Sequence, residues 1–467
     1  MSSRARNLRN NDTIAAVATP SGVGGIHVVR LSGPDSRRIT DSIFVGGTTL
    51  SEAPSHTAHY GNIVDRSTGK LLDEVIAVLM WEPKSYTCED TVEFSTHGSP
   101  YISGKLVEML VANGARLAKP GEFTLRAFLN GRLDLSQAEA VADLIAARTE
   151  SSHQIALAQL AGNLSDLINE LRDSLLTSLS LLEAYTDFPE EDIESSHYQK
   201  VKASVESARV VIDKLLNSFD TGRILKDGLR VPIIGPPNSG KSSLFNYLLD
   251  HDRAIVFPEP GTTRDTISES ISIGGLTVQL TDTAGLHDST DSVERAGIER
   301  SKKAIERADI LIGLADGTSE SVADAVAAMM RRAGNTPILC AVNKVDLLNK
   351  SEIEVLRASL SDKTLYISSV RGDGIEELRQ TVLESALPGG RFRDEDEIRI
   401  ASIRHKAALQ EAKEQLGAVS LAFSEERSHE FVAFDLKLAV ASLGEIVGEI
   451  TADEVLNRIF SDFCIGK

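Results

Sequence analysis

Cysteine is scarce in this chain of 467 residues, and its three thiols lie far apart in the sequence. They are Cys88, Cys340 and Cys464, with no C-x-x-C pair among them. A disulfide framework or a structural zinc site requires cysteines at short, regular spacings, so the sequence argues against both. Few, scattered thiols are typical of the reducing cytosol, and we expect a cytoplasmic protein.

The sequence also lacks a long apolar run. No stretch approaches the roughly 20 apolar residues that span a bilayer, so we expect no membrane segment. Residues 1–11 are polar and lack the apolar centre of a secretory signal. Acidic residues outnumber basic ones by 68 to 49, and the net charge of −19 argues against a general nucleic-acid coat protein. Any contact with RNA would then use a local basic patch.

A phosphate-binding motif stands near the middle of the chain. Residues 235–242, GPPNSGKS, fit G-x-x-x-x-G-K-[ST] between the strand-like run 229–234 and a helix-like run. The N–H groups of such a loop turn toward phosphate oxygens at the N-terminus of a helix. We expect the Lys241 ammonium to reach the β- and γ-phosphates and the Ser242 hydroxyl to bind Mg²⁺. The motif predicts binding, and with it hydrolysis, of a nucleoside triphosphate.

Two further motifs follow in the order that a guanine-nucleotide switch protein needs. Residues 260–265, PGTTRD, contain Thr263, which we expect to give Mg²⁺ a second hydroxyl and to sense the γ-phosphate. Residues 282–285, DTAG, follow a strand-like run. We expect Asp282 to hold Mg²⁺ through water and the N–H of Gly285 to contact the γ-phosphate.

The last two motifs predict selectivity for guanine. Residues 343–346, NKVD, follow the apolar run 338–342, and Asp346 can accept both N1–H and the exocyclic amino group of guanine. Adenine offers neither donor, so such a carboxylate selects GTP over ATP. Ser368 and Ser369 stand where a backbone amide would meet guanine O6. The predicted nucleotide-binding residues are Asn238, Ser239, Gly240, Lys241, Ser242, Ser243, Thr262, Thr263, Asp282, Thr283, Ala284, Gly285, Asn343, Lys344, Asp346, Ser368 and Ser369.

Each short motif alone could be an ordinary turn at a strand end, because Asp, Asn, Gly and Ser all favour turns. Five motifs in the correct order, each after an apolar run, argue against that alternative. Together they predict a Ras-like P-loop GTPase domain.

The catalytic water needs an unusual partner in this chain. Where Ras-like proteins have a glutamine after the D-x-x-G glycine, this sequence has Leu286, which cannot hydrogen-bond water. Glu294 is the best candidate for orienting the water, and the phosphate-binding Lys241 is the other predicted catalytic residue. The alternative is that Glu294 is an ordinary solvated carboxylate. Asn238 could ligate a monovalent cation that replaces an arginine finger, or it could be a plain variable position of the loop.

Composition divides the chain into zones and predicts a multidomain protein of α/β and α type. Residues 12 to about 128 read as an α+β domain, with strands at 23–31, 59–64, 74–80 and 91–95 and a helix at 101–113. Between residues 133 and 222, apolar side chains follow the 3.6-residue period of long amphipathic helices, and no proline follows Pro388. The simplest topology is one helical domain interrupted by an inserted GTPase domain. The expected ranges are 1–128 (N-terminal), 129–227 (first helical part), 228–388 (GTPase) and 389–467 (second helical part).

Several longer segments resemble the MnmE (TrmE) family of bacterial tRNA modification GTPases, and the resemblance covers essentially the full chain. These segments are more specific than the general GTPase motifs. They are residues 11–15, 24–33, 120–135, 282–301 and 463–467.

The resemblance implies a role for the N-terminal domain. In this family the domain is similar to folate-dependent aminomethyltransferase domains, forms a homodimer, and binds 5-formyl- or methylene-tetrahydrofolate. By motif, the folate contacts fall on Arg30, Glu93, Arg132 and Lys467. Glu93 could accept the pterin N–H donors, and the glutamate tail would suit Arg30, Arg132 or Lys467. Without the family, these residues would read as ordinary surface and terminal charges.

The resemblance also implies a reaction. The family acts with an FAD-dependent partner, MnmG (GidA), to add an aminomethyl or carboxymethylaminomethyl group at C5 of the wobble uridine, position 34, of certain tRNAs. Potassium-dependent dimerisation of the GTPase domains activates hydrolysis. Glu294 aligns with the water-orienting glutamate of the family. The potassium site corresponds to Asn238 and the loop residues Phe257, Glu259 and Thr262.

Two alternatives stay open at this point. Cys464 could attack uracil C6 as a thiolate, or it could be a structural thiol while the partner protein supplies the nucleophile. The chain could also be a regulatory or ribosome-assembly GTPase with a helical arm for interactions. A KH-like RNA domain or a second GTPase domain would favour that reading, and we find neither in the sequence.

Overall fold

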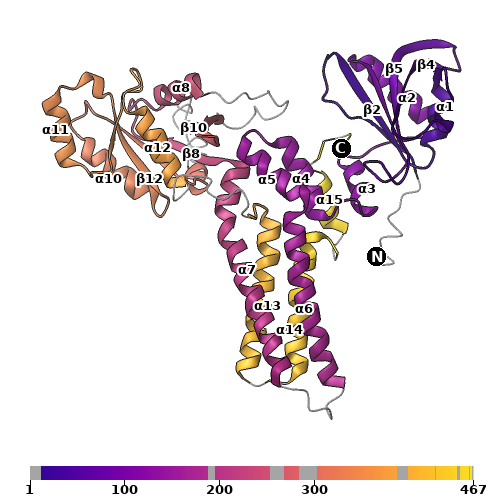
Figure 1. Cartoon of the computed structure of the whole chain (residues 1–467). Helices are drawn as coiled ribbons and strands as arrows, with labels where there is room; N and C mark the ends of the chain where they lie inside the picture. Colours follow the sequence, from indigo (N-terminus) through magenta and orange to yellow (C-terminus); the bar gives the residue numbers. More distant parts are fainter. Residues whose placement is uncertain are drawn as a thin grey trace. The chain divides into compact units, whose positions relative to one another are not determined.

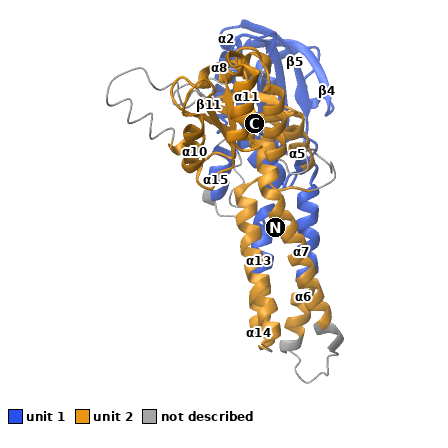
Figure 2. Cartoon of the chain, turned by 90° about the vertical axis from the view of Figure 1, so that its left-hand side faces the viewer, with its two compact units in different colours: residues 1–142, 159–176, 437–467 blue, residues 143–158, 177–436 orange. Residues whose placement is uncertain are grey.

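The structure, a computed structural model, describes residues 12–187, 195–252, 268–282, 302–386, 398–425, 427–449, 453–461, 463–464 and 466 (Figure 1). The chain forms two compact units, each built from several stretches of sequence (Figure 2). In the described part of the chain, no helix is long and apolar enough to cross a membrane. Unit 1 comprises residues 1–142, 159–176 and 437–467, and unit 2 comprises residues 143–158 and 177–436.

A mostly antiparallel sheet forms the centre of unit 1. Its seven strands run in the order β3-β4-β5-β6-β2-β1-β7, and β7 pairs parallel with β1. The strands that the sequence predicts in this region are confirmed, with ends that differ by a few residues. The bounds are β1 (Ile14–Val17), β2 (Ile26–Ser32), β3 (Phe44–Gly46), β4 (Thr57–Asp65), β5 (Lys70–Met80), β6 (Thr91–His97) and β7 (Arg116–Leu117).

Helices α1 (Ser36–Ile43) and α2 (Pro100–Ala112) cover one face of this sheet. Side chains alternate between the two faces of a strand, so Val29 and Leu31 of β2 are buried against the helices. Arg30 lies between them in sequence and therefore belongs to the opposite face. The short helix η1 (Leu50–Glu52) adds Leu50 to the buried side.

A cluster of charged side chains connects α3 (Glu122–Leu129) with Asp12, just before the first strand of unit 1. The nearly buried guanidinium of Arg126 donates to Asp12 at 2.7 Å, to Glu89 at 3.2 Å and to Glu122 at 3.2 Å. Arg116 also donates to Glu122, and this hydrogen bond, with a second one to Asp12, raises the pKa of Arg116. Buried charges are stable only when they are paired in this way, so the cluster fixes α3 against the sheet.

The end of the chain packs against the same helix. Phe460 at the end of α15 (Asp453–Ser461) and Phe463 form a small core with Leu135 and Ala138. The N–H of Gly121, just before α3, donates to the carbonyl oxygen of Cys464 at 3.4 Å. Gly121 has a left-handed backbone with φ of 64°, which favours glycine.

Unit 2 contains a six-stranded sheet in the order β13-β12-β11-β8-β10-β9. All neighbours pair parallel except β9 with β10. Parallel strands need crossover helices, and these cover both faces. The strands are β8 (Leu229–Ile234), β9 (Ser268–Ile273), β10 (Leu276–Asp282), β11 (Leu311–Asp316), β12 (Ile338–Asn343) and β13 (Leu365–Tyr366).

Two separate hydrophobic cores lie on the two faces of this sheet. Helices α8 (Lys241–Asp252) and α12 (Ile375–Ala386) supply one, and α10 (Val322–Ala333) supplies the other, against which α11 (Lys350–Ser359) adds Leu356. This doubly wound arrangement after a P-loop strand confirms the predicted Ras-like domain.

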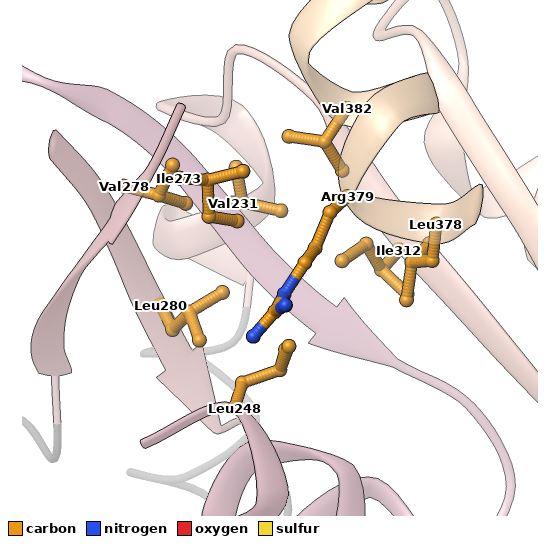
Figure 3. A pocket seen from close by; sticks show the side chains of 9 residues that line it. All are labelled: Val231, Leu248, Ile273, Val278, Leu280, Ile312, Leu378, Arg379 and Val382. Carbon is orange, nitrogen blue, oxygen red and sulfur yellow. The ribbon is translucent and has the colours of Figure 1, made fainter. Parts of the chain in front are cut away.

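One of these cores contains a small pocket (Figure 3). Its lining is apolar apart from Arg379, whose side chain also donates to Glu376 at 2.9 Å. A ligand site normally combines apolar walls with several converging polar groups, so we regard this pocket as part of the core.

The predicted long amphipathic helices are confirmed. Helices α7 and α13 pack side by side in unit 2, with Lys413 paired to Asp213 at 2.7 Å. Gly162, with φ of 101°, separates α5 from α6. The four expected domain ranges stay a prediction, because each unit combines parts of several ranges. The helices are α4 (Leu135–Ala146), α5 (Glu150–Ala161), α6 (Asn163–Asp187), α7 (Ser195–Asp227), α13 (Ile403–Ser424) and α14 (His429–Val447).

Helix α7 leads directly into the sheet of unit 2, with only Gly228 between it and β8. Ile224 and Leu225 of its last turns belong to the hydrophobic core of that sheet. Arg223 donates to Asp309 at 2.6 Å, and the same carboxylate accepts the backbone N–H of Arg230 at 2.9 Å. The apolar packing and the ion pair together fix the end of α7 against the sheet.

Candidate functional site

The loop after β8 has the geometry of a phosphate-binding loop. It joins the end of β8 at Ile234 to the start of α8 at Lys241, so it opens onto the N-terminus of a helix. Asn238 and Gly240 have left-handed backbone conformations, with φ of 61° and 91°. A β-carbon at Gly240 would collide with the side-chain amide of Asn343, so the residue there has to be glycine. The positive end of the helix dipole favours an anion at this place.

Lys241 adds a positive charge to the loop. Its side chain is buried, and Nζ donates to the carbonyl oxygens of Gly235 at 3.0 Å and Pro236 at 2.7 Å. These two acceptors hold the ammonium group beside the loop. Ser242, the next residue of α8, is exposed and could present its hydroxyl to a metal ion. The loop, the helix end and Lys241 therefore fit a polyphosphate, and Ser242 fits Mg²⁺.

Asn343, at the end of β12, connects the loop to a third segment. Its side chain is fully buried, and Nδ2 donates to the carbonyl oxygen of Ser239 at 2.9 Å and to Oγ of Ser369 at 3.1 Å. Its Oδ1 accepts the backbone N–H of Ser369 at 3.0 Å. One amide thus joins the phosphate-binding loop to the turn after β13.

The carboxylate of Asp346 lies beside that same turn. Ser368 donates from Oγ to Oδ1 of Asp346 at 2.7 Å, which fixes the orientation of the half-buried carboxylate. Asp346 belongs to the short helix η2 (Val345–Leu347). A carboxylate with a fixed orientation can accept two parallel N–H donors from a flat base.

Lys344 and Asp316 form an ion pair at the neighbouring strand ends. Lys344 Nζ lies 2.5 Å from Asp316 Oδ2, and Thr318 donates to Oδ1 from both its backbone N–H and its hydroxyl. Burial works to raise the pKa of Asp316, but the hydrogen bonds from Lys344 and Thr318 outweigh it, so the pKa lies below its ordinary value. Lys344 has a left-handed backbone with φ of 65°, and the ion pair helps to hold that conformation.

Asp316 is not among the residues that the sequence motifs indicate. It ends the apolar run 311–316, LIGLAD, in the same way that Asp282 and Asn343 end theirs. That repeated pattern could have indicated that Asp316 belongs to the site, because the carboxyl ends of parallel strands meet at one edge of a sheet.

Some of the remaining predicted residues lie inside the described part of the chain and others lie outside it. Asp282 ends β10, whose backbone pairs with β8 opposite Ile233. Ser243 is exposed on α8. The residues outside are Phe257, Glu259, Thr262, Thr263, Thr283, Ala284, Gly285, Glu294 and Lys467.

A second candidate site lies on the open face of the sheet in unit 1. Arg30 and Glu93 lie opposite each other on β2 and β6, and Arg30 Nε donates to Glu93 at 2.7 Å. Arg132 lies close by, because the guanidinium carbons of Arg30 and Arg132 are 5.5 Å and 5.0 Å from the centre of the Tyr86 ring. Three of the four predicted folate residues therefore gather in one place.

The chain end approaches the same site. Arg30 Nη1 donates to the carbonyl oxygen of Gly466 at 3.3 Å, and a β-carbon at Gly466 would collide with the backbone of Val17 on β1. Cys464 is exposed, two residues earlier. Two guanidinium groups and a carboxylate suit a ligand with both N–H donors and carboxylates, so the cluster fits a folate.

Comparisons with known proteins find matches over almost the full length of the chain. A family model described as the MnmE helical domain matches residues 135–464, and one described as the GTP-binding protein TrmE N-terminus matches residues 13–132. The tRNA modification GTPase MnmE of Natranaerobius thermophilus is 41% identical over 457 residues, which is 98% of this chain and 99% of that protein. The protein of the same name from Moorella thermoacetica is 42% identical over 465 residues, which is 98% of this chain and 100% of that protein.

The Lys344–Asp316 pair predicts an acid-sensitive contribution to stability. Because the pKa of Asp316 is lowered by folding, its contribution is complete above the ordinary value of about 3.9 and is lost as the pH falls through the lower folded-state value. Asp316→Asn should reduce the free energy of unfolding by roughly 1 to 2 kcal/mol at pH 7 and by less at pH 3, which lies below the ordinary pKa of an aspartate. Urea unfolding followed by circular dichroism measures both.

The matched control is Asp362→Asn, which changes an exposed aspartate of the same sheet domain. This variant should unfold like the wild type at both pH values. An effect of Asp316→Asn that is equally large at pH 7 and pH 3 would show that the carboxylate charge is not what stabilises the site.

Proposed function

The chain belongs to the MnmE family of tRNA modification GTPases, and we propose that it hydrolyses GTP in the modification of a tRNA uridine. The observation that carries this proposal is the connection between the phosphate-binding loop and the guanine-facing segments. Asn343 joins Ser239 of the loop to Ser369, and Ser368 orients Asp346. A triphosphate and a guanine base can therefore be recognised by one continuous set of contacts.

Guanine is selected by Asp346 in this proposal. Its carboxylate accepts N1–H and the exocyclic amino group, and adenine has no donor at either position. The hydrogen bond from Ser368 supports this role, because it fixes the carboxylate before the base arrives. A nucleotide with the wrong base leaves that carboxylate without a partner, which costs more than a lost contact at an exposed site.

The phosphates bind to the loop and to Lys241, with Mg²⁺ held by Ser242, Thr263 and, through water, Asp282. When bound, Mg²⁺ neutralises charge that develops on the phosphate oxygens. Lys241 does the same from the protein side, and the N–H groups of residues 239–242 add their dipoles. Glu294 orients the attacking water, which explains how the chain works with Leu286 where a glutamine is usual.

Potassium completes the site in the proposed mechanism. Asn238 and the loop residues Phe257, Glu259 and Thr262 would hold the ion, which would supply the positive charge that an arginine finger supplies elsewhere. The left-handed backbone at Asn238 supports this, because it turns the loop at the point where the side chain has to reach the ion. The GTPase domains of two copies then meet in a homodimer.

The modification chemistry belongs to unit 1. We propose that Arg30, Glu93, Arg132 and Lys467 bind 5-formyl- or methylene-tetrahydrofolate as the one-carbon donor. Glu93 accepts the pterin N–H groups and is oriented by Arg30, while Arg132 faces the carboxylates of the glutamate tail. Together with the FAD-dependent partner MnmG, this site would supply the aminomethyl-type group at C5 of the wobble uridine. The convergence of Arg30, Glu93 and Arg132 supports a common ligand.

Guanine selectivity predicts the effect of Asp346→Asn. An asparagine cannot accept both guanine donors, so GTP affinity should fall roughly a hundredfold or more. Xanthosine triphosphate should bind better to the variant than to the wild type, because asparagine can donate to the carbonyl group at C2 of xanthine. Equilibrium titration with fluorescent nucleotides measures both affinities, and Asp362→Asn serves again as the control. Unchanged GTP affinity would exclude Asp346 from base recognition.

Potassium activation predicts the salt dependence of hydrolysis. The wild type should hydrolyse GTP much faster in potassium chloride than in sodium chloride. Glu294→Ala should lower the rate in potassium by about a hundredfold or more, with GTP binding preserved. Glu306→Ala, a change of an exposed glutamate, is the control and should behave as the wild type. Equal rates in both salts would refute the potassium site, and an undiminished variant would refute the role of Glu294.

A further inference from the structure

Two arginines of the proposed folate site contact the same aromatic ring. The guanidinium carbon of Arg132 lies 5.0 Å from the centre of the Tyr86 ring, and that of Arg30 lies 5.5 Å from it. Both distances are within the range of a cation–π interaction. Tyr86 is absent from the residues that the sequence analysis selected, and the proposed function gives it no role.

The segment that carries Tyr86 is held in one conformation. The hydroxyl of Ser85 donates to the carbonyl oxygen of Glu89 at 2.6 Å, and Asn130 donates to the carbonyl oxygen of Thr87 at 2.7 Å. Cys88 has a left-handed backbone, with φ of 58°. A non-glycine residue keeps such a conformation only where its surroundings hold it, and these conformations concentrate at functional sites.

The ring of Tyr86 is fixed as well. Its hydroxyl group lies 2.9 Å from Oγ1 of Thr124, a fully buried residue of α3. One hydrogen bond at the tip and a fixed backbone at the base leave the ring little freedom to rotate. It can therefore serve as a rigid platform for a guanidinium group.

The two arginines depend on this platform to different degrees. Arg30 has further partners in Glu93, the carbonyl oxygen of Gly466 and the Phe123 ring, whose centre is 5.4 Å away. Arg132 is exposed, and among the described residues its one hydrogen bond, besides the ring contact, goes to the carbonyl oxygen of Ser85 at 3.0 Å. No carboxylate among the described residues forms an ion pair with Arg132.

Arg132 therefore has a charge that is available to an anionic ligand, and its position is set by Tyr86 and the backbone of Ser85. We infer that Tyr86 is a positioning residue that holds Arg132 ready for the carboxylates of the folate glutamate tail. This inference rests on the proposed folate site and adds to it a determinant of tail recognition. The gain in affinity comes from preorganisation, because a long exposed arginine otherwise loses side-chain freedom on binding.

The test compares two ligands and three variants by isothermal titration calorimetry of the full chain. The ligands are 5-formyltetrahydrofolate and a 5-formyltetrahydropterin that lacks the glutamate tail. Tyr86→Leu removes the ring, Tyr86→Phe keeps it without the hydroxyl, and Tyr101→Leu changes an exposed tyrosine elsewhere in the same unit. Thermal unfolding of each variant reports whether the fold is intact.

Tyr86→Leu should bind 5-formyltetrahydrofolate roughly three- to thirtyfold more weakly, the range that a cation–π contact supports. Its affinity for the tailless pterin should stay at the wild-type value, since Arg30 and Glu93 have other supports. Tyr86→Phe should bind the complete folate almost as well as the wild type does, and Tyr101→Leu should bind both ligands normally.

Three results would overturn the inference. An equal loss for both ligands in Tyr86→Leu would mean that the residue is merely structural, and an unchanged affinity for the complete folate would mean that the ring does not position Arg132. A Tyr86→Phe variant as weak as Tyr86→Leu would assign the effect to the hydroxyl group. A wild type that binds neither ligand would refute the folate site itself, which is a separate outcome and removes the premise.

Discussion

The nucleotide site depends on one buried amide. Asn343 has no exposed surface, yet its side chain makes hydrogen bonds to Ser239 and Ser369, which belong to two other segments. Because a buried polar group without partners is costly, the three segments are stable only when they lie together. The phosphate-binding loop and the turn of Ser369, to which we assign the base, are therefore set relative to each other before a nucleotide binds. The same amide occupies the space that a side chain at residue 240 would need, which explains why a glycine precedes Lys241.

The two candidate sites use arginine and lysine in different ways. Arg126 is almost buried among Asp12, Glu89 and Glu122, so its charge is fully compensated and its role is to hold α3. Arg132 is exposed over an aromatic ring and is available to an anionic ligand in the proposed folate site. Lys241 belongs to the phosphate-binding loop, where its Nζ donates to two neutral carbonyl oxygens. Burial with a carboxylate thus distinguishes a structural cation from one that can bind an anion.

Much of the fold could be predicted from the sequence, because motifs and apolar periods are local features. The run 229–234 is the strand β8 with the same bounds, and the expected helix at 101–113 is α2 at Pro100–Ala112. Contacts between residues far apart in sequence could not be predicted in the same way. The ion pair of Asp316 with Lys344 depends on the pairing of β11 with β12, and the position of Tyr86 under two arginines depends on how an irregular loop folds back. Neither contact follows from a regular residue spacing, so neither can be predicted from a single sequence.

If this chain uses GTP hydrolysis in the modification of tRNA, the nucleosides of cellular tRNA should depend on it. Cells that lack the protein would be complemented with the wild type or with Lys241→Ala, and the wobble uridine would be analysed by mass spectrometry. We predict that the C5-modified uridine disappears on deletion, returns with the wild type and does not return with the variant. A tRNA whose uridine modification is unchanged by the deletion would contradict the claim and would favour a regulatory or ribosome-assembly GTPase.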